Sequence, residues 1–428
     1  MTGIPELDAD EIAQRLGQHA LWARKVTGGV RAILSHQNLA GMDLNGANLR
    51  EAVLTGADLS GCNLMGADLR DADLFAANLS EANLRGANLS RADLRGANLC
   101  GADLTYAVLQ KADLREGSLM RQDEDLAAAE SQSDHSGESG EGSGTIQRAA
   151  LLSDAKLSHA NVSQANLTGA VMIRTDLSDA NLNGSILKSV NLTGAKLIRA
   201  NLESANLNGA NLESANIEGA NLAKAELVGV ILLGVNISAA DTTGANIQIN
   251  VDSLRSEVRS IIDLHQQWID SFGRAGARAR LDGEDFSYVI FDGMNLSGSS
   301  IKGATLYGAS FRGCDLTMAD LSSSNLEGAD LSNAILRGTR LNGSVLKKAK
   351  LVGADLSPKE IMGRDGKPTG SAASTNLVGA DLSRADLSQA NFSGAQMVDA
   401  TMTRARITGT NFEGTVFEGV ELKRATGS

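Results

Sequence analysis

The sequence has almost no proline and very few aromatic residues. Of its 428 residues, 3 are proline, and Phe, Trp and Tyr together make up 3%. Because proline interrupts ladders of backbone hydrogen bonds, its scarcity fits a long series of paired backbone segments. The scarcity of aromatic side chains favours an interior that is too narrow for rings.

Cysteine and long hydrophobic runs are also scarce. The 3 cysteines, Cys62, Cys100 and Cys314, are few, odd in number and far apart, which predicts reduced thiols in a cytosolic protein. The longest apolar run, residues 227–235, is about half the length that a membrane span requires. The first residues show no basic region followed by an apolar one, so we expect no signal peptide. These features predict a cytoplasmic, bacterial protein.

Basic residues are fewer than acidic ones. The chain has 39 Lys and Arg against 51 Asp and Glu, which gives a formal net charge of −12. This balance disfavours direct nucleic-acid binding over the whole surface, although it would suit a partner that normally binds DNA.

What the sequence has in abundance is a repeat of five residues. From Ala77 to Leu94 it reads ANLSEANLRGANLSRADL: a small residue, Asn or Asp, then Leu, then two variable positions. Neither the helical period of 3.6 nor the strand period of 2 produces this spacing, so it indicates a structural repeat.

The A-[D/N]-L-x-x unit resembles the signature of the pentapeptide-repeat proteins. The resemblance implies an all-β solenoid: a right-handed quadrilateral parallel β-helix with four pentapeptides per coil. The residue chemistry is compatible with this fold. Leu and the small residue two before it can point inward, while Asn and Asp suit corners, where they bond to nearby backbone groups. Successive coils would then stack about 4.8 Å apart.

Repeat centres fall into four runs, namely Leu34 to Leu119, Leu152 to Ile247, Leu281 to Leu356 and Leu377 to Leu422. Residues 120–149 are acidic and rich in Ser and Gly, which predicts a disordered loop on the side of the solenoid. Residues 357–376, which include Pro358 and Pro368, predict a second loop with turns.

Two segments with helical spacing precede repeats. Residues 9–26 carry His19 and Trp22, and residues 253–272 repeat that spacing with His265 and Trp268. Solenoid ends expose unpaired edges and therefore require caps. We expect two tandem domains, 1–250 and 251–428, each with an N-terminal capping helix and its own β-helix.

The two matching histidines are the best candidates for chemistry. They could bind a metal or transfer protons, but no other potential ligand recurs around both at ligand spacing, which favours a structural role on the buried face of each helix. Hydrolase, phosphate-loop and paired-cysteine motifs are absent from the sequence. We therefore expect no enzymatic activity, no cofactor and no metal.

A small basic run lies beside the second helix. Arg274, Arg278 and Arg280 could form a nucleic-acid patch, but no aromatic residues are interleaved to stack on bases. A solvated cap surface is the favoured interpretation.

Three apolar residues occupy outward positions near the end of the second run: Val228, Ile231 and Leu233. A monomer seldom leaves such a cluster bare. We expect the helix at 253–272, or the first coil after it, to cover them. The competing interpretation is a homodimer or partner interface.

Together these features predict a non-catalytic scaffold or spacer that binds a protein partner, whose identity the sequence does not give. The family resemblance implies an alternative, a DNA mimic that binds DNA gyrase or topoisomerase IV and confers quinolone resistance. The duplication, the N-terminal helices and the mixed charge of the repeat faces argue against that alternative.

Overall fold

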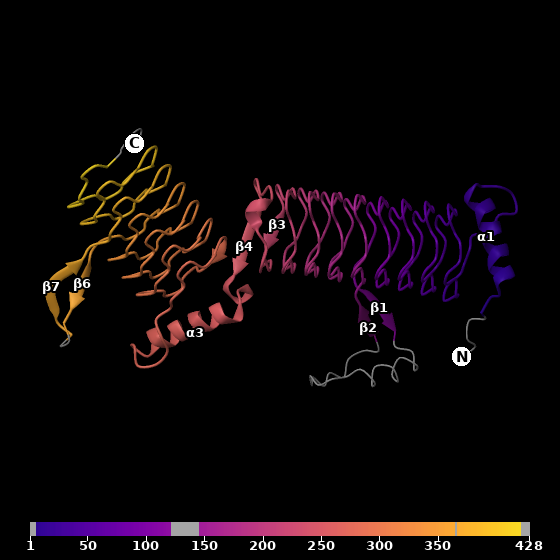
Figure 1. Ribbon diagram of the computed structural model, residues 1–428, viewed down its shortest axis with the longest axis horizontal. Coiled ribbons are helices and arrows are strands. Elements are labelled where there is room, and N and C mark those ends of the chain that lie inside the picture. Colours follow the sequence, from indigo (N-terminus) through magenta and orange to yellow (C-terminus); the bar gives the residue numbers. More distant parts are fainter. Residues whose placement is uncertain (1–5, 121–144, 364–365, 421–428) are drawn as a thin grey trace. The chain divides into compact units, whose positions relative to one another are not determined.

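The computed structural model describes residues 6–120, 145–363 and 366–420. The chain forms two compact units, Met1–Ile247 and Gln248–Ser428. Each unit contains a stack of coils and a helix. The colours of Figure 1 follow the sequence and show which coils belong to each unit. The boundary predicted at residue 250 lies at the end of strand β4 (Asn246–Asn250), close to the division between the units.

Within each unit the coils repeat every twenty residues. Parallel bridges join Ile33 to Val53, Val53 to Asp73 and so on along the first unit, and Arg280 to Ser300 and onward along the second. Twenty residues are four pentapeptides, so each coil has four sides. Most rungs are single bridges rather than long strands, and the coils therefore form narrow ladders instead of broad sheets.

The repeat Ala82–Asn83–Leu84 illustrates why this sequence forms a coil. Ala82 and Leu84 are 1% and 0% exposed, so both inward positions are filled. The Leu84 amide donates to the Asp103 carbonyl of the next coil at 2.7 Å. The Asn83 side chain accepts from the Arg85 amide at 3.3 Å and holds the corner.

The second variable position of each repeat turns the chain. Its backbone is left-handed, with φ of 64° at Gly86 and 58° at Glu81. Glycine adopts this conformation without steric cost, which explains why it recurs there.

Four asparagines of the first unit form a ladder. Asn161, Asn181, Asn201 and Asn221 lie in successive coils, and each amide nitrogen donates to the preceding side-chain oxygen at 3.1 to 3.4 Å. These bonds link neighbouring coils outside the backbone ladder.

Aromatic rings do fit the interior of the second unit, contrary to the expectation of an interior too narrow for them. Phe291 and Phe311 are buried in adjacent coils, with ring centroids 5.0 Å apart and nearly parallel planes. Because both rings replace Leu at the same place in their coils, they can stack along the axis.

The cysteine positions follow the repeat. Cys62 and Cys314 point inward and are buried, Cys100 is half-buried, and all three are free thiols. Burial raises the pKa of Cys62 above its usual value and that of Cys314 to about 12.

Among the described residues, each unit has one α-helix. Helix α1 (Ala9–Ala23) begins with a capping box between Asp8 and Glu11 and ends before residue 26, the predicted end. Helix α3 (Ser256–Asp270) begins after the 3-10 helix η2 (Val251–Ser253), so it is shorter than the predicted 253–272 at both ends. No helix in the described part of the chain is long and apolar enough to cross a membrane.

The first interruption of the repeats leaves the coils as a hairpin. Strands β1 (Gly117–Met120) and β2 (Thr145–Arg148) pair antiparallel, while the ladder continues directly from Asn98 to Leu151. The predicted loop 120–149 is therefore partly strand, and the assignment of Leu119 as a repeat centre was wrong. Residues 121–144, the centre of that loop, lie outside the described residues.

The second interruption has the same design. Strands β6 (Lys359–Met362) and β7 (Pro368–Ala373) pair antiparallel, and the ladder continues from Arg340 to Asn376. The predicted loop at 357–376 is therefore largely a hairpin. Both hairpins appear beside their own coils in Figure 1.

The regular pattern weakens at the end of the first unit, which contains strand β3 (Glu226–Val228) and the 3-10 helix η1 (Ile237–Ala239). There the repeat centres Leu232 and Ile237 are only half-buried. In the second unit, Ile249 and Asn250 of β4 pair in parallel with strand β5 (Val289–Ile290).

Candidate functional site

The helix and first coil of the first unit meet at His19. Its ring is 0% exposed and stacks on Trp22, with centroids 5.3 Å apart. Its Nδ1 accepts the backbone hydrogen of Ala32 at 3.1 Å. The sequence-based grouping of His19 with Trp22 therefore corresponds to a direct contact.

The second unit repeats this arrangement. His265 is 1% exposed, stacks on Trp268 at 5.7 Å and accepts the backbone hydrogen of Ala279 at 3.1 Å. The two junctions therefore use the same side chain for the same bond.

In the first coil of each unit, the histidine Nδ1 replaces a backbone carbonyl that the preceding repeat supplies in later coils. In later coils the amide of the small inward residue donates to the carbonyl of the repeat centre three residues earlier, as Ala52 does to Leu49 at 3.0 Å. Three positions before Ala32 and Ala279 stand Gly29 and Gly276 instead. A side chain on Gly29 would overlap the Trp22 backbone at 2.1 Å, so only glycine fits there.

The bonding pattern sets the tautomer of both histidines. Because Nδ1 accepts a hydrogen, the proton of the neutral ring lies on Nε2. In the described part of the chain, Nε2 of His19 and of His265 is buried and has no hydrogen-bond partner. Burial lowers the pKa of both rings, and a nearby arginine, Arg31 or Arg278, lowers it further. The histidines are thus structural acceptors with one unsatisfied donor each.

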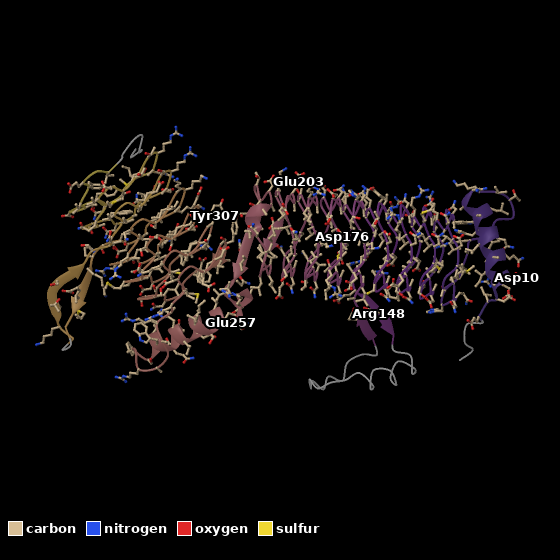
Figure 2. All side chains as sticks on the ribbon, in the orientation of Figure 1. Asp10, Arg148, Asp176, Glu203, Glu257 and Tyr307 are labelled. Carbon is tan, nitrogen blue, oxygen red and sulfur yellow. The ribbon has the colours of Figure 1, made fainter. Side chains whose placement is uncertain are left out.

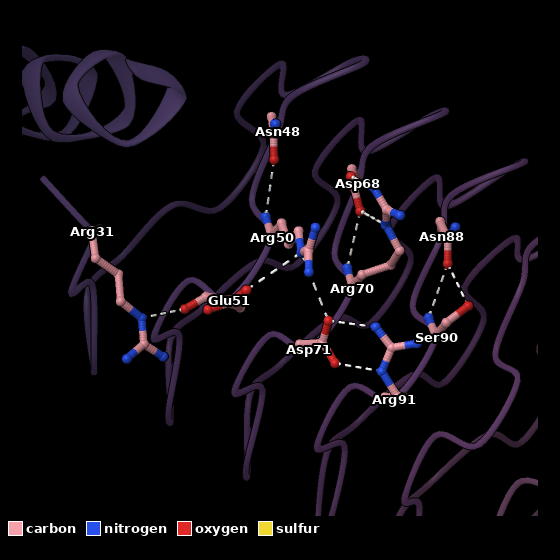
Figure 3. Close-up of polar contacts among 10 residues, drawn as sticks. All are labelled: Arg31, Asn48, Arg50, Glu51, Asp68, Arg70, Asp71, Asn88, Ser90 and Arg91. Carbon is pink, nitrogen blue, oxygen red and sulfur yellow. Dashed lines mark hydrogen bonds and ion pairs between the residues drawn. The ribbon is translucent and has the colours of Figure 1, made fainter. Parts of the chain in front are cut away.

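Charged side chains form a ladder beside the first junction (Figure 3). Arg50 lies 3.4 Å from Glu51 and 3.8 Å from Asp71, and Arg91 donates two 2.6 Å hydrogen bonds to Asp71. These bonds hold the pKa of the Asp71 carboxyl below its usual value. Successive coils are thereby tied at their corners by alternating charges.

A cavity of about 530 Å³ lies between this ladder and the helix end, lined by Trp22, Lys25, Arg50 and Glu51 among others. Because Arg50 and Glu51 pair with each other, the net charge of this lining is that of Lys25 alone.

The second junction has a cavity of about 520 Å³ with a different lining. Arg278 lies over the ring of Trp268 at 4.8 Å from its centroid. Lys302 and Arg340 both approach one carboxylate oxygen of Asp320, at 3.4 and 3.1 Å. Three cations and one carboxylate therefore line this cavity.

Asp320 is the anchor of that cluster. It is 8% exposed, and burial alone would raise its pKa. Hydrogen bonds from Ser322 and Arg340, together with the charge of Lys302, lower the pKa of Asp320 overall. The carboxyl is therefore ionised at neutral pH and orders both cations.

In the sequence, Lys302, Asp320 and Arg340 belong to no motif that marks them as functional. Writing the chain in rows of twenty would place Ser300, Asp320 and Arg340 in one column, which points to Asp320 and Arg340 but not to Lys302. No group of three or more His, Cys, Asp or Glu residues that could hold a metal occurs among the residues described.

The apolar cluster is half-exposed. Val228 ends β3, and its amide donates to the Asn208 side chain at 2.8 Å. Ile231 is half-buried on a ladder rung with Asn211, and Leu233 is 36% exposed. The three residues lie in the last coils of the first unit, as their spacing predicts.

The sequence of the chain matches the family model described as pentapeptide repeats (8 copies). The matched stretches together span more than half of the chain and comprise residues 32–71, 67–105, 82–119, 150–188, 185–222, 210–248, 279–317, 319–357 and 373–404. No curated protein matches the sequence.

Solved structures of repeat proteins show limited similarity. HetL, a pentapeptide repeat protein involved in heterocyst differentiation regulation from the cyanobacterium Nostoc sp. strain PCC 7120, is 23% identical; the match covers 78% of this chain and 86% of HetL at a TM-score of 0.21. Rfr23, a pentapeptide repeat protein from the cyanobacterium Cyanothece 51142, is 29% identical over 36% of this chain and 87% of its own, with a TM-score of 0.17.

Full-length QnrB1, a plasmid-mediated fluoroquinolone resistance protein, is 19% identical over 51% of this chain and 93% of its own, with a TM-score of 0.17. Because all these TM-scores are low, the family assignment rests on the sequence match.

Proposed function

Since the chain belongs to the pentapeptide-repeat family, we propose that it is a non-catalytic scaffold or spacer that presents its coil faces to a protein partner. The observation that carries this proposal is the twenty-residue register of the bridges. That register repeats the outward positions at coil spacing and so forms regular faces. Figure 2 shows the side chains along the coils, with Asp176, Glu203 and Tyr307 labelled.

One outward contact supports a binding role. Tyr106 is 58% exposed and stacks on His159 of the adjoining coil, with centroids 5.0 Å apart and planes 10° from parallel. Exposed, preordered aromatic groups are common anchors of protein interfaces. Because its ring is already ordered by the stack, Tyr106 would lose little conformational freedom on binding.

In this proposal each helix caps its own solenoid. The two units are a tandem duplication, and their coils are right-handed, as the family implies. The matching bonds from Ala32 to His19 and from Ala279 to His265 support the capping role. A coil edge left without such an acceptor would expose an unpaired amide.

Binding to DNA gyrase or topoisomerase IV is the less favoured function. Asp73, Asp93 and Asp113 form a column on one face, but Arg95 and Arg115 pair with the latter two at 2.6 and 2.7 Å. Such pairing weakens the continuous negative potential that a DNA mimic would need. The free thiols are compatible with the reducing cytoplasm that we propose as its location.

The scaffold function is tested by quantitative affinity capture from cells that produce the protein. We expect a partner to be retained by the wild type and by Ile186→Ala, which changes another exposed outward residue, and to be lost with Tyr106→Ala. Equal recovery with all three proteins would contradict binding through Tyr106. A supercoiling assay with purified gyrase separates the alternative, since a scaffold leaves the reaction rate unchanged.

A further inference from the structure

The cavity of the second junction concentrates positive charge in an acidic protein. Lys302 and Arg340 meet at a single oxygen of Asp320, so their cationic groups lie close together. The pair forms no other ion pair in the described part of the chain. With Arg278, the lining carries two more positive than negative charges.

A buried hydroxyl in the same lining has no partner. Ser299 is 1% exposed, and its Oγ forms no hydrogen bond with the described residues. Other hydroxyls at this repeat position donate to backbone carbonyls. Ser324 donates to Ile301 and Thr339 to Leu316 of the preceding coil, each at 2.7 Å, and Ser344 donates to Leu341 of its own coil at 2.6 Å. Ser299, at an inward position of its coil, therefore keeps a donor that the other hydroxyls at this position use for a carbonyl.

The fold does not demand this arrangement, because the first junction lacks it. Counting from the histidine-bound alanines, Lys302 and Arg340 correspond to Thr55 and Asp93, and Ser299 corresponds to Ala52. The space beside Trp268 also differs: Ser297 and Gly298 stand there, and their counterparts in the first unit are the paired Arg50 and Glu51.

We propose that this cavity binds a small phosphate ester, with the phosphate between Lys302, Arg340 and Arg278 and the organic part against Trp268 and Met318. A phosphate monoester carries close to two negative charges at neutral pH, which matches the excess charge of the lining. Arginine and lysine form their strongest hydrogen bonds with such oxygens. The volume of about 520 Å³ is in the range of small-molecule sites. The site is independent of the scaffold function.

The test uses phenyl phosphate as the probe and the full chain as the protein. Isothermal titration calorimetry should show one saturable site, with inorganic phosphate binding more weakly because it lacks the ring. The chain has 2 tryptophans, so the variant Trp22→Phe keeps only Trp268. Its fluorescence should change with phenyl phosphate concentration along the same binding curve.

Matched variants separate the site from general charge. Arg340→Gln and Lys302→Gln should each weaken binding by about tenfold. Arg406→Gln should have no effect, although Arg406 pairs with Asp386 as Arg340 pairs with Asp320. Ser297→Arg with Gly298→Glu copies the filled first junction and should abolish binding while leaving the circular dichroism unchanged.

The proposal would be overturned if phenyl phosphate showed no saturable binding at millimolar concentration, or if Arg406→Gln lost as much binding as Arg340→Gln. A phosphotyrosine peptide that binds tenfold more tightly than phenyl phosphate would instead assign the site to a phosphorylated protein and overturn the small-molecule assignment.

Discussion

His265 holds the amide of Ala279 at 3.1 Å with the same nitrogen, Nδ1, that His19 uses for Ala32. Each ring must be neutral at Nδ1 to accept that hydrogen, and burial lowers the pKa of both below the usual 6.5. The unfolded chain therefore binds protons more readily than the folded one as the pH falls through 6.5.

We accordingly predict that unfolding becomes easier below pH 6.5. The stability that the neutral rings contribute is complete above that pH and is lost as the pH falls toward their folded pKa values, by at most about 1.4 kcal/mol per pH unit for each group. Urea unfolding monitored by circular dichroism at pH 7.5 and 5.5 measures the loss. His19→Gln keeps an acceptor without titrating, so its pH dependence should be smaller than that of the wild type. An unchanged pH dependence would contradict the role given to His19.

A second prediction concerns the asparagine ladder. Asn201 donates to Asn181 and accepts from Asn221, so Asn201→Asp loses a donor and places a carboxylate against an oxygen. We expect a loss of about 1 kcal/mol in the free energy of unfolding. Asn211→Asp is the control, because the Asn211 side chain accepts from the Glu213 amide, as aspartates do at corners elsewhere. Equal melting temperatures of the two variants would rule out a stabilising ladder.

A third prediction concerns the first interruption. Since the ladder passes directly from Asn98 to Leu151, joining Met120 to Thr145 with a short glycine linker should leave the coils intact. The far-ultraviolet circular dichroism and the melting temperature should stay close to those of the full chain. Removing residues 86–90 deletes one pentapeptide, which is one side of a coil. The residues of that coil can then no longer pair with those of the next coil in register, so the melting temperature should fall sharply. A large loss from the linker variant would mean that residues 121–144 are required for stability.

The apolar cluster gives a fourth prediction. Ile231→Lys with Leu233→Lys places two charges among half-exposed apolar groups. If the cluster packs within the chain, the melting temperature falls by several degrees and the oligomeric state is unchanged. Light scattering distinguishes the competing interpretation, in which the melting temperature is kept and a dimer dissociates.

The repeat pattern predicts the inward residues because it records a steric demand. Leu84 and Ala82 are buried where their spacing places them, and the pattern holds from coil to coil. It fails at Leu119, which keeps the five-residue spacing while the backbone has already left the coil in β1. Spacing alone does not distinguish a coil side from a strand that continues with the same step.

The candidate sites were less predictable. The shared spacing identifies His19 and His265 as a matching pair. The sequence does not show that their Nδ1 replaces a backbone carbonyl, or that their Nε2 has no partner among the described residues. The cluster around Asp320 needs the coil register and also the side-chain conformations of Lys302 and Arg340. Those conformations depend on packing rather than on repeat identity.

Both hairpins begin and end at one corner of a coil, and the rungs Asn98–Leu151 and Arg340–Asn376 close behind them. A residue's height in its stack is therefore set by the number of complete turns before it and not by its distance along the chain. Segments of different length or composition can be exchanged at these corners without moving any later face. The same corners offer attachment points at which a foreign peptide would be displayed at a fixed level.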